Sequence, residues 1–79
     1  MSSEELNNLK WQRPFQPFRI TTVNDEVFDI TQPGLILVGK FDVNIGIPHR
    51  HKPLPAVKDV VWLGVEDIVR VEPIQSVKA

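Results

Sequence analysis

The chain has 79 residues, of which 42% are hydrophobic, so it is long enough for one domain with a small core and too apolar to be disordered. Without cysteine it has no disulfides, thiolate metal ligands or cysteine nucleophiles, which favours a cytoplasmic protein over a small secreted one. The formal net charge is −1 and is spread evenly, so no overall field attracts nucleic acid. The longest uncharged apolar run, 35–39, is far short of the roughly 20 residues of a membrane helix, so no membrane partner is expected.

Residues 2–12 are predicted to form a short N-terminal helix. Ser2 and Glu5 have the spacing of a capping box, in which each side chain bonds the backbone of the other residue. The apolar positions of this helix are Leu6, Leu9 and Trp11. Because two turns of helix are marginal in water, the helix either docks on the rest of the domain or frays. Docking is favoured, since Trp11 would otherwise be exposed.

The segment 13–18 cannot be helical, because Pro14 and Pro17 each force the preceding residue into extended backbone. Two interpretations are open. The segment is either a proline-rich ligand for another domain or a rigid entry into the sheet that places Phe15 and Phe18 in the core. The second is favoured, because both aromatic residues lie close to a predicted strand.

A β-hairpin is predicted next, with strands at 18–23 and 26–31 and a tight turn at Asn24 and Asp25. Its inward side chains are expected to be Phe18, Ile20, Thr22, Phe28 and Ile30. Pro33 and Gly34 then end the second strand. The run 35–38 that follows is apolar throughout, which predicts a strand that is buried on both faces or that meets a partner chain.

The clearest alternation in the chain lies at 41–47, where every second residue is large and apolar. A strand turns successive side chains to opposite faces, so one face is predicted to be buried. The buried side chains would be Phe41, Val43, Ile45 and Ile47, and Asp42 and Asn44 would point to water. Gly46 would allow a close approach to the backbone or bend the strand. We interpret this strand as the one around which the others pair.

Five further segments complete the expected order. The first is a long loop at 48–56, which holds three prolines and a run of polar residues. A strand at 57–63 follows, and its contiguous apolar residues suggest that both faces are covered. A single helical or 3-10 turn is expected at 64–68, and a last short strand at 69–72. The tail 75–79 is expected to be mobile.

Together these elements predict a single mainly β domain over residues 1–79, a small five-stranded barrel with a short N-terminal α-helix. The order resembles the Sm-like and SH3-like barrels. The likeness to Sm-like bacterial RNA chaperones lies in the capped helix, the strand–turn–strand at 19–29 and the turn with closing strand at 64–73. Sm-like barrels join edge strands into rings, so this resemblance implies a homo-oligomer. The segments 13–20, 24–26 and 68–73 are also similar to small bacterial proteins of unknown function.

The long loop carries the main local cluster of basic residues. The candidate anion-binding or nucleic-acid-binding side chains are His49, Arg50, His51, Lys52, Lys40 and Lys58. Single-stranded nucleic-acid sites usually pair such charges with exposed aromatic rings, whereas most aromatic residues here occupy core-like positions and Trp11 is the exception that could be exposed. His49 and His51 would need further metal ligands, for which Asp42, Asp59 and Glu66 are the plausible donors. A solvated loop is favoured over a metal site, and no metal or cofactor is predicted.

Catalysis is not predicted from this sequence. The serines lie near the termini, tyrosine and cysteine are absent, and the four glycines are isolated, so no phosphate-binding loop exists. Asp42 and Asp59 are a pair of carboxylates that a sheet could bring together. The surplus of apolar strand instead indicates a non-catalytic interaction or assembly module that self-associates through Leu35, Leu37, Val69 and Val71. The alternative is a small RNA-binding barrel that uses the loop 49–52, and a protein partner is also open.

Overall fold

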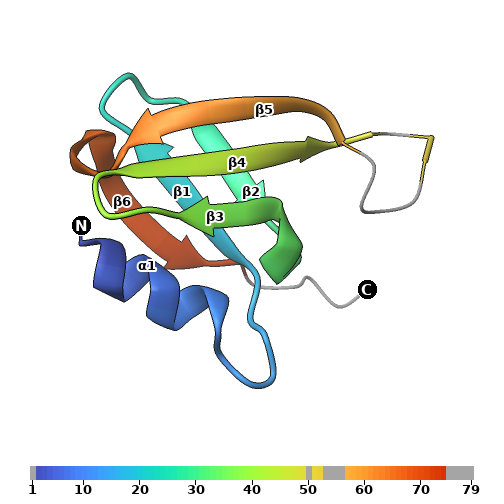
Figure 1. The fold of residues 1–79 in the computed structure, drawn as a ribbon, viewed down its shortest axis with the longest axis horizontal. Coiled ribbons are helices and arrows are strands. Elements are labelled where there is room, and N and C mark those ends of the chain that lie inside the picture. Colours follow the sequence, from blue (N-terminus) through green and yellow to red (C-terminus); the bar gives the residue numbers. More distant parts are fainter. Residues whose placement is uncertain (1, 50, 53–56, 75–79) are drawn as a thin grey trace.

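The computed structural model describes residues 2–49, 51–52 and 57–74, which form a mainly β fold with one short helix (Figure 1). The helix is α1 (Ser3–Lys10), and two 3-10 turns are η1 (Pro33–Leu35) and η2 (Val65–Asp67). The strands are β1 (Phe18–Thr22), β2 (Val27–Ile30), β3 (Ile36–Val38), β4 (Asp42–Pro48), β5 (Val57–Gly64) and β6 (Ile68–Pro73). The predicted tail at 75–79 lies outside the described residues.

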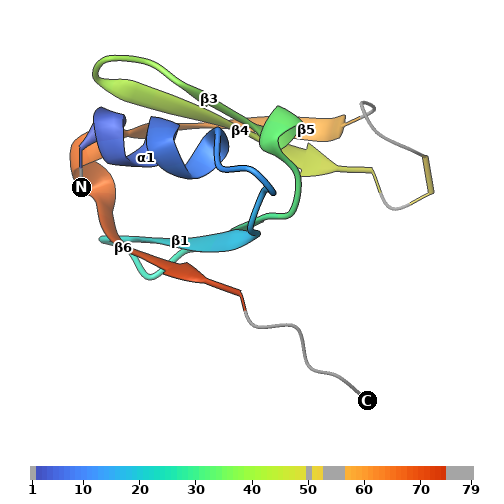
Figure 2. The ribbon, with the colours of Figure 1, turned by 90° about the horizontal axis from the view of Figure 1, so that it is seen from below.

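The strands form two antiparallel three-stranded sheets, with orders β2-β1-β6 and β3-β4-β5. The sheets lie one above the other as two layers, and α1 runs along one side between them (Figure 2). The core fills the space that these elements enclose. Its buried side chains are Leu6, Phe18, Ile20, Ile30, Leu35, Ile36, Val43, Ile45, Val65 and Ile68.

The described residues contain six strands, one at each of the six strand segments predicted from the sequence, whereas the expected barrel had five. Pro33 and Gly34 begin the 3-10 turn η1, which separates β2 from β3 as the sequence predicted. The proline cannot donate to a ladder, which explains why strand pairing stops there. The two sheets are not closed into a barrel within the described part of the chain.

The helix begins with the predicted capping box. The Glu5 backbone N–H donates to Ser2 Oγ at 3.2 Å, and the Ser2 backbone N–H donates to Glu5 Oε1 at 3.3 Å. Leu6 docks the helix and is fully buried, while Lys10 Nζ donates to the Ile36 carbonyl of β3 at 2.6 Å. The expectation that docking would cover Trp11 is wrong, because this side chain is 65% exposed. It lies five residues after Leu6, which turns it about 140° around the helix from the docked face.

The predicted hairpin is present as β1 and β2, paired in register from Phe18 opposite Ile30 to Thr21 opposite Val27. The turn is longer than the predicted two residues, since the Thr22 N–H donates to the Glu26 carbonyl at 2.9 Å. Asp25 adopts a positive φ of 64°, a conformation that asparagine and aspartate tolerate better than most residues. In the preceding segment, Phe18 lies in the core and Phe15 packs partly buried against it, with ring centroids 5.9 Å apart.

The alternation predicted for the central strand is correct for β4 itself. Val43 and Ile45 are fully buried, and Ile47 packs against the core. The prediction for Phe41 is wrong, because this side chain is 76% exposed. Phe41 lies in the turn before β4, where the period of two does not apply. Gly46 permits a close approach, as expected: a Cβ there would lie 3.0 Å from Val57 Cγ1 and 3.6 Å from Leu35 Cδ2.

The C-terminal elements follow the predicted order. β5 pairs with β4 from Asp42 opposite Gly64 to Pro48 opposite Val57, and η2 leads into β6, which pairs with β1. The two-sided cover expected for 57–63 is wrong, because Trp62 of β5 is 70% exposed. For 35–38, burial on both faces does not occur within the chain, since Leu37 of β3 is 61% exposed, and the alternative of a partner chain stays open. Both β3 and β5 therefore have one face that the rest of the chain leaves uncovered.

Candidate interaction surface

The outer faces of the two sheets differ in chemistry. On the sheet β2-β1-β6, Arg19 lies opposite Asp29 on one side and Glu72 on the other. Arg19 Nε donates to Asp29 Oδ1 at 2.7 Å, and this hydrogen bond, together with the attraction between the charges, lowers the pKa of the Asp29 carboxyl despite some burial. Arg70 lies on the same face, opposite Thr21. This row of charges is a solvated surface.

The outer face of the sheet β3-β4-β5 is mainly apolar instead, with the exposed Asp42 at one end of β4. Because Val43 and Ile45 point to the core, Asn44 points outward, and the register places Leu37 and Trp62 directly opposite it on the two neighbouring strands. Val60 is two residues from Trp62 on the same strand and is 48% exposed. We call these four side chains the outer patch: Leu37, Asn44, Val60 and Trp62. In Figure 1 this sheet lies in front of β1 and β2.

Asn44 is the polar centre of the outer patch, on the middle strand of the sheet. Its Oδ1 atom is buried and has no hydrogen-bond partner among the residues that the structure describes. A buried acceptor without a partner costs about 1–3 kcal/mol relative to the hydrated atom. Within residues 2–49, 51–52 and 57–74, this acceptor is therefore left without a hydrogen bond in the middle of an apolar surface.

The four residues predicted for self-association occupy three different settings. Leu37 belongs to the outer patch, whereas Leu35 is 2% exposed and packs in the core. Val69 is exposed where the register between β1 and β6 shifts, and Val71 lies opposite Ile20 and packs against the core. Because β3 and β6 belong to different sheets, the structure does not bring Leu37, Val69 and Val71 onto one surface.

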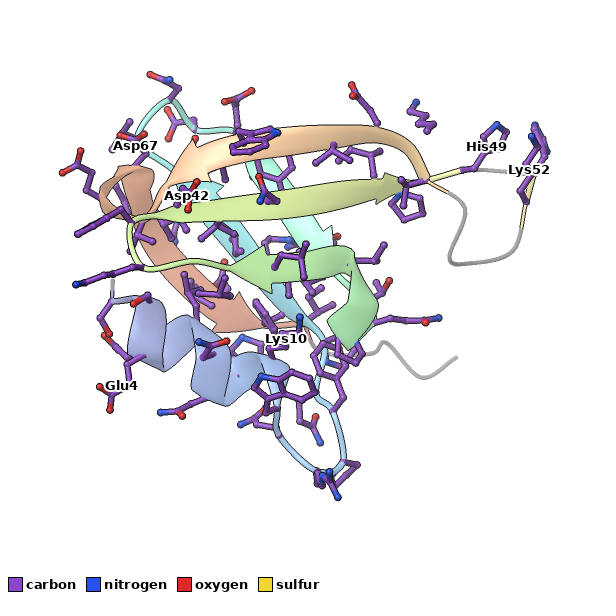
Figure 3. The ribbon with its side chains drawn as sticks, in the orientation of Figure 1. Glu4, Lys10, Asp42, His49, Lys52 and Asp67 are labelled. Carbon is purple, nitrogen blue, oxygen red and sulfur yellow. The ribbon has the colours of Figure 1, made fainter. Side chains whose placement is uncertain are left out.

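The predicted basic cluster is only partly assembled. The His51 N–H donates to His49 Nδ1 at 3.3 Å, and Lys58 follows Val57, the residue opposite Pro48. Figure 3 places His49 and Lys52 beyond one end of β4 and Asp42 at its other end. Lys40, two residues before Asp42, is therefore remote from the cluster, and its ammonium lies 5.4 Å from the Phe41 ring centroid. Arg50 lies outside the described residues.

The carboxylates do not form the pair that the sequence suggested. Asp42 lies opposite Gly64 and Asp59 lies opposite Ile47, so about five residues of β4, roughly 17 Å, separate their positions. Within residues 2–49, 51–52 and 57–74, no group of three or more histidine and acidic side chains is arranged to hold a metal ion. The rings of His49 and His51 have centroids 6.4 Å apart.

The main feature that sequence reasoning missed is the exposure of aromatic residues. Trp11, Phe41 and Trp62 are all at least 65% exposed, although sequence reasoning identified only Trp11 as an aromatic residue that could be exposed. Trp62 lies in the apolar run 60–63, in which either alternate set of residues could have faced the core. The signal that decides between them is the outward polar residue Asn44 on the neighbouring strand, and it becomes readable only when the register is known.

A further hollow is an open pocket of about 230 Å³ beside the C-terminal end of α1. Its lining is mostly apolar and comprises Leu9, Gln12, Gln16, Pro17, Phe18, Val71, Glu72 and Pro73.

Among the described residues, no helix is long and apolar enough to cross a membrane. No protein-family model, curated protein or solved structure matches this chain.

Proposed function

We propose that this protein is a non-catalytic assembly module that self-associates, and that a second copy covers the outer patch. The observation that carries the proposal is the contrast between two sheets of equal strand number. One has a charged outer face with the Arg19–Asp29 ion pair, and the other exposes Leu37 and Trp62 around an unpartnered amide oxygen. Monomeric proteins rarely expose contiguous apolar patches larger than a few hundred Å² unless these meet a partner.

A second copy is the occupant that fits the chemistry of this surface. The outer patch itself carries no charge, although the exposed Asp42 lies two residues from Asn44 on the same face of β4. Its one polar group, an amide, is both donor and acceptor and so can pair with itself. A chain this small also buries a limited share of its own surface, which makes self-association a common source of added stability.

The size of the sheet indicates a weak dimer. Seven residues of β4 at about 3.4 Å each, and three strands about 4.8 Å apart, give a footprint of about 24 by 14 Å. Two such footprints amount to roughly 700 Å², which is below the about 1,200 Å² that stable specific interfaces bury and therefore indicates a weak association. We therefore expect a dissociation constant in the micromolar range.

The resemblance to Sm-like barrels supports self-association but suggests a different surface. If β2, η1 and β3 correspond to one interrupted strand, the two sheets join into one in which β5 and β6 are the edge strands. Sm-like barrels form rings through such edge strands. Here the Val60 N–H on β5 is bonded to Asp59 Oδ1 at 2.8 Å, and Pro73 has no N–H to offer on β6. These features leave fewer backbone N–H groups on either edge strand for pairing with a strand of another copy, so the outer patch is the preferred contact.

The test compares two exposed tryptophans. A tryptophan has roughly 250 Å² of surface, so the exposed 70% of Trp62 is about 175 Å², and burying it would contribute at most about 4 kcal/mol per copy. Sedimentation of the wild type from about 5 to about 500 µM should show a monomer–dimer equilibrium. Trp62→Glu should abolish it, and Trp11→Glu, a control that lies off the patch, should not. A wild type that remains monomeric, or equal effects of both variants, would refute the proposal.

Nucleic-acid binding is the alternative, supported by the basic residues His49, His51 and Lys52 and by the exposed rings that a stacking site needs. The two features are separated, however, because Trp62 lies opposite Asn44, about 14 Å along β4 from Pro48. Fluorescence anisotropy with a labelled single-stranded RNA at low salt distinguishes the two functions. We expect no binding. Binding that falls with salt and with the double variant Arg50→Ala/Lys52→Ala would favour the alternative.

A further inference from the structure

We infer that the second copy packs face to face with two-fold symmetry, so that Asn44 lies against Asn44 of the other copy. This inference rests on the proposed self-association and specifies its geometry. Cyclic two-fold dimers are the commonest homo-oligomers, and their interface uses the same patch on both copies. When two sheet faces pack in this way, the symmetry axis lies in the plane of the interface, and a residue on the axis meets its own equivalent.

Asn44 is the residue that such an axis would meet. It lies on the middle strand, between Leu37 and Trp62, so a central axis along the strand or across it passes through this position. An axis along β4 would also set Leu37 of one copy over Trp62 of the other. Either axis places Asn44 against Asn44 of the other copy, and the packing of the neighbouring side chains determines which direction the axis takes.

The chemistry of the amide matches this position. Packed sheets lie about 10 Å apart, and two amides that each reach about 3.5 Å from their Cα atoms are joined across that gap by a hydrogen bond of about 2.9 Å. The two-fold axis lets Nδ2 of each copy donate to Oδ1 of the other. Oδ1 is covered in the single chain, so this pair requires Oδ1 to leave its buried position on dimerisation, by rotation about the broad terminal torsion of asparagine. The pair would thus satisfy the acceptor that the single chain leaves without a partner.

Charge-swap variants test this geometry. Asn44→Asp and Asn44→Lys should each remain monomeric in sedimentation, because like charges would face each other across the axis. An equimolar mixture should form a heterodimer that dissociates as salt is raised. The matched controls Asn8→Asp and Asn8→Lys alter an exposed asparagine of α1 and should dimerise like the wild type. Retained dimers of the single Asn44 variants, or a mixture that stays monomeric, would overturn the inference.

A cross-linking experiment keeps the inference testable if a charged variant fails to fold. The chain has no cysteine, so Asn44→Cys introduces a single thiol. A short bismaleimide should link this variant into covalent dimers at concentrations where the wild type dimerises, and adding Trp62→Glu should prevent the link. Asn8→Cys should give little product. If the wild type dimerises but Asn44→Cys does not cross-link, the face-to-face geometry is wrong and the proposed self-association stands. If the wild type is a monomer, both are wrong.

Discussion

Replacing Asn44 by leucine should make the isolated chain more stable. Leucine has nearly the shape of asparagine, and it removes the Oδ1 atom that is buried without a partner. Leaving such an acceptor unmet costs about 1–3 kcal/mol, and an apolar group of the same shape does not carry that cost. For a chain of 79 residues the total stability is expected to be about 4–12 kcal/mol, so the gain is a large fraction of the whole.

Thermal unfolding followed by circular dichroism measures this gain. In a domain of this size each kcal/mol shifts the Tm by about 4–8 °C, so Asn44→Leu should melt at least 4 °C higher than the wild type. The unfolding is measured at low micromolar protein concentration, where the wild type is a monomer and dimerisation does not stabilise it. Asn8→Leu, at an exposed helical position, is the control and should change stability by less than about 0.5 kcal/mol. An Asn44→Leu variant that is no more stable than the wild type would refute the reasoning.

Three further predictions concern the fold. Leu6→Ala should cost about 2–5 kcal/mol in urea unfolding, since Leu6 is fully buried and docks α1; a loss below about 1 kcal/mol would mean that the helix is not held there. Because Arg19 lowers the pKa of Asp29, this ion pair stabilises the fold above pH 3.8, and the contribution disappears at lower pH. The Tm of the wild type should therefore exceed that of Asp29→Asn fully at pH 7, and the difference should vanish in acid. A difference in Tm that does not depend on pH would contradict this prediction. Gly46→Ala should destabilise the fold by about 1 kcal/mol through its contact with Val57, and a Val57→Ala background should relieve the loss.

Much of the local structure could be predicted because its causes lie within a few residues of sequence. The capping box joins Ser2 to Glu5, three residues apart, and the helix begins there as expected. The alternation around Val43 and Ile45 determines which face of β4 is buried, because strand geometry allows no other arrangement. The mainly β class, the hairpin and the 3-10 turn before the last strand follow from signals of the same range. The grouping of Lys40 with the loop residues failed because it required the positions of both ends of β4.

The candidate surface depends on contacts that cross the sequence. The run Val60-Val61-Trp62-Leu63 is apolar on both faces, so by itself it permits either pair of side chains to face the core. Pairing with β4 decides the matter, since Val61 lies opposite the buried Ile45 and Leu63 opposite the buried Val43, which turns Val60 and Trp62 outward. The amino-acid sequence thus determined which segments are strands and which face of β4 is apolar. Only the tertiary structure decided which large apolar side chains of β5 face away from the core, because that depends on the register that places Asn44 opposite Trp62, eighteen residues further along the chain.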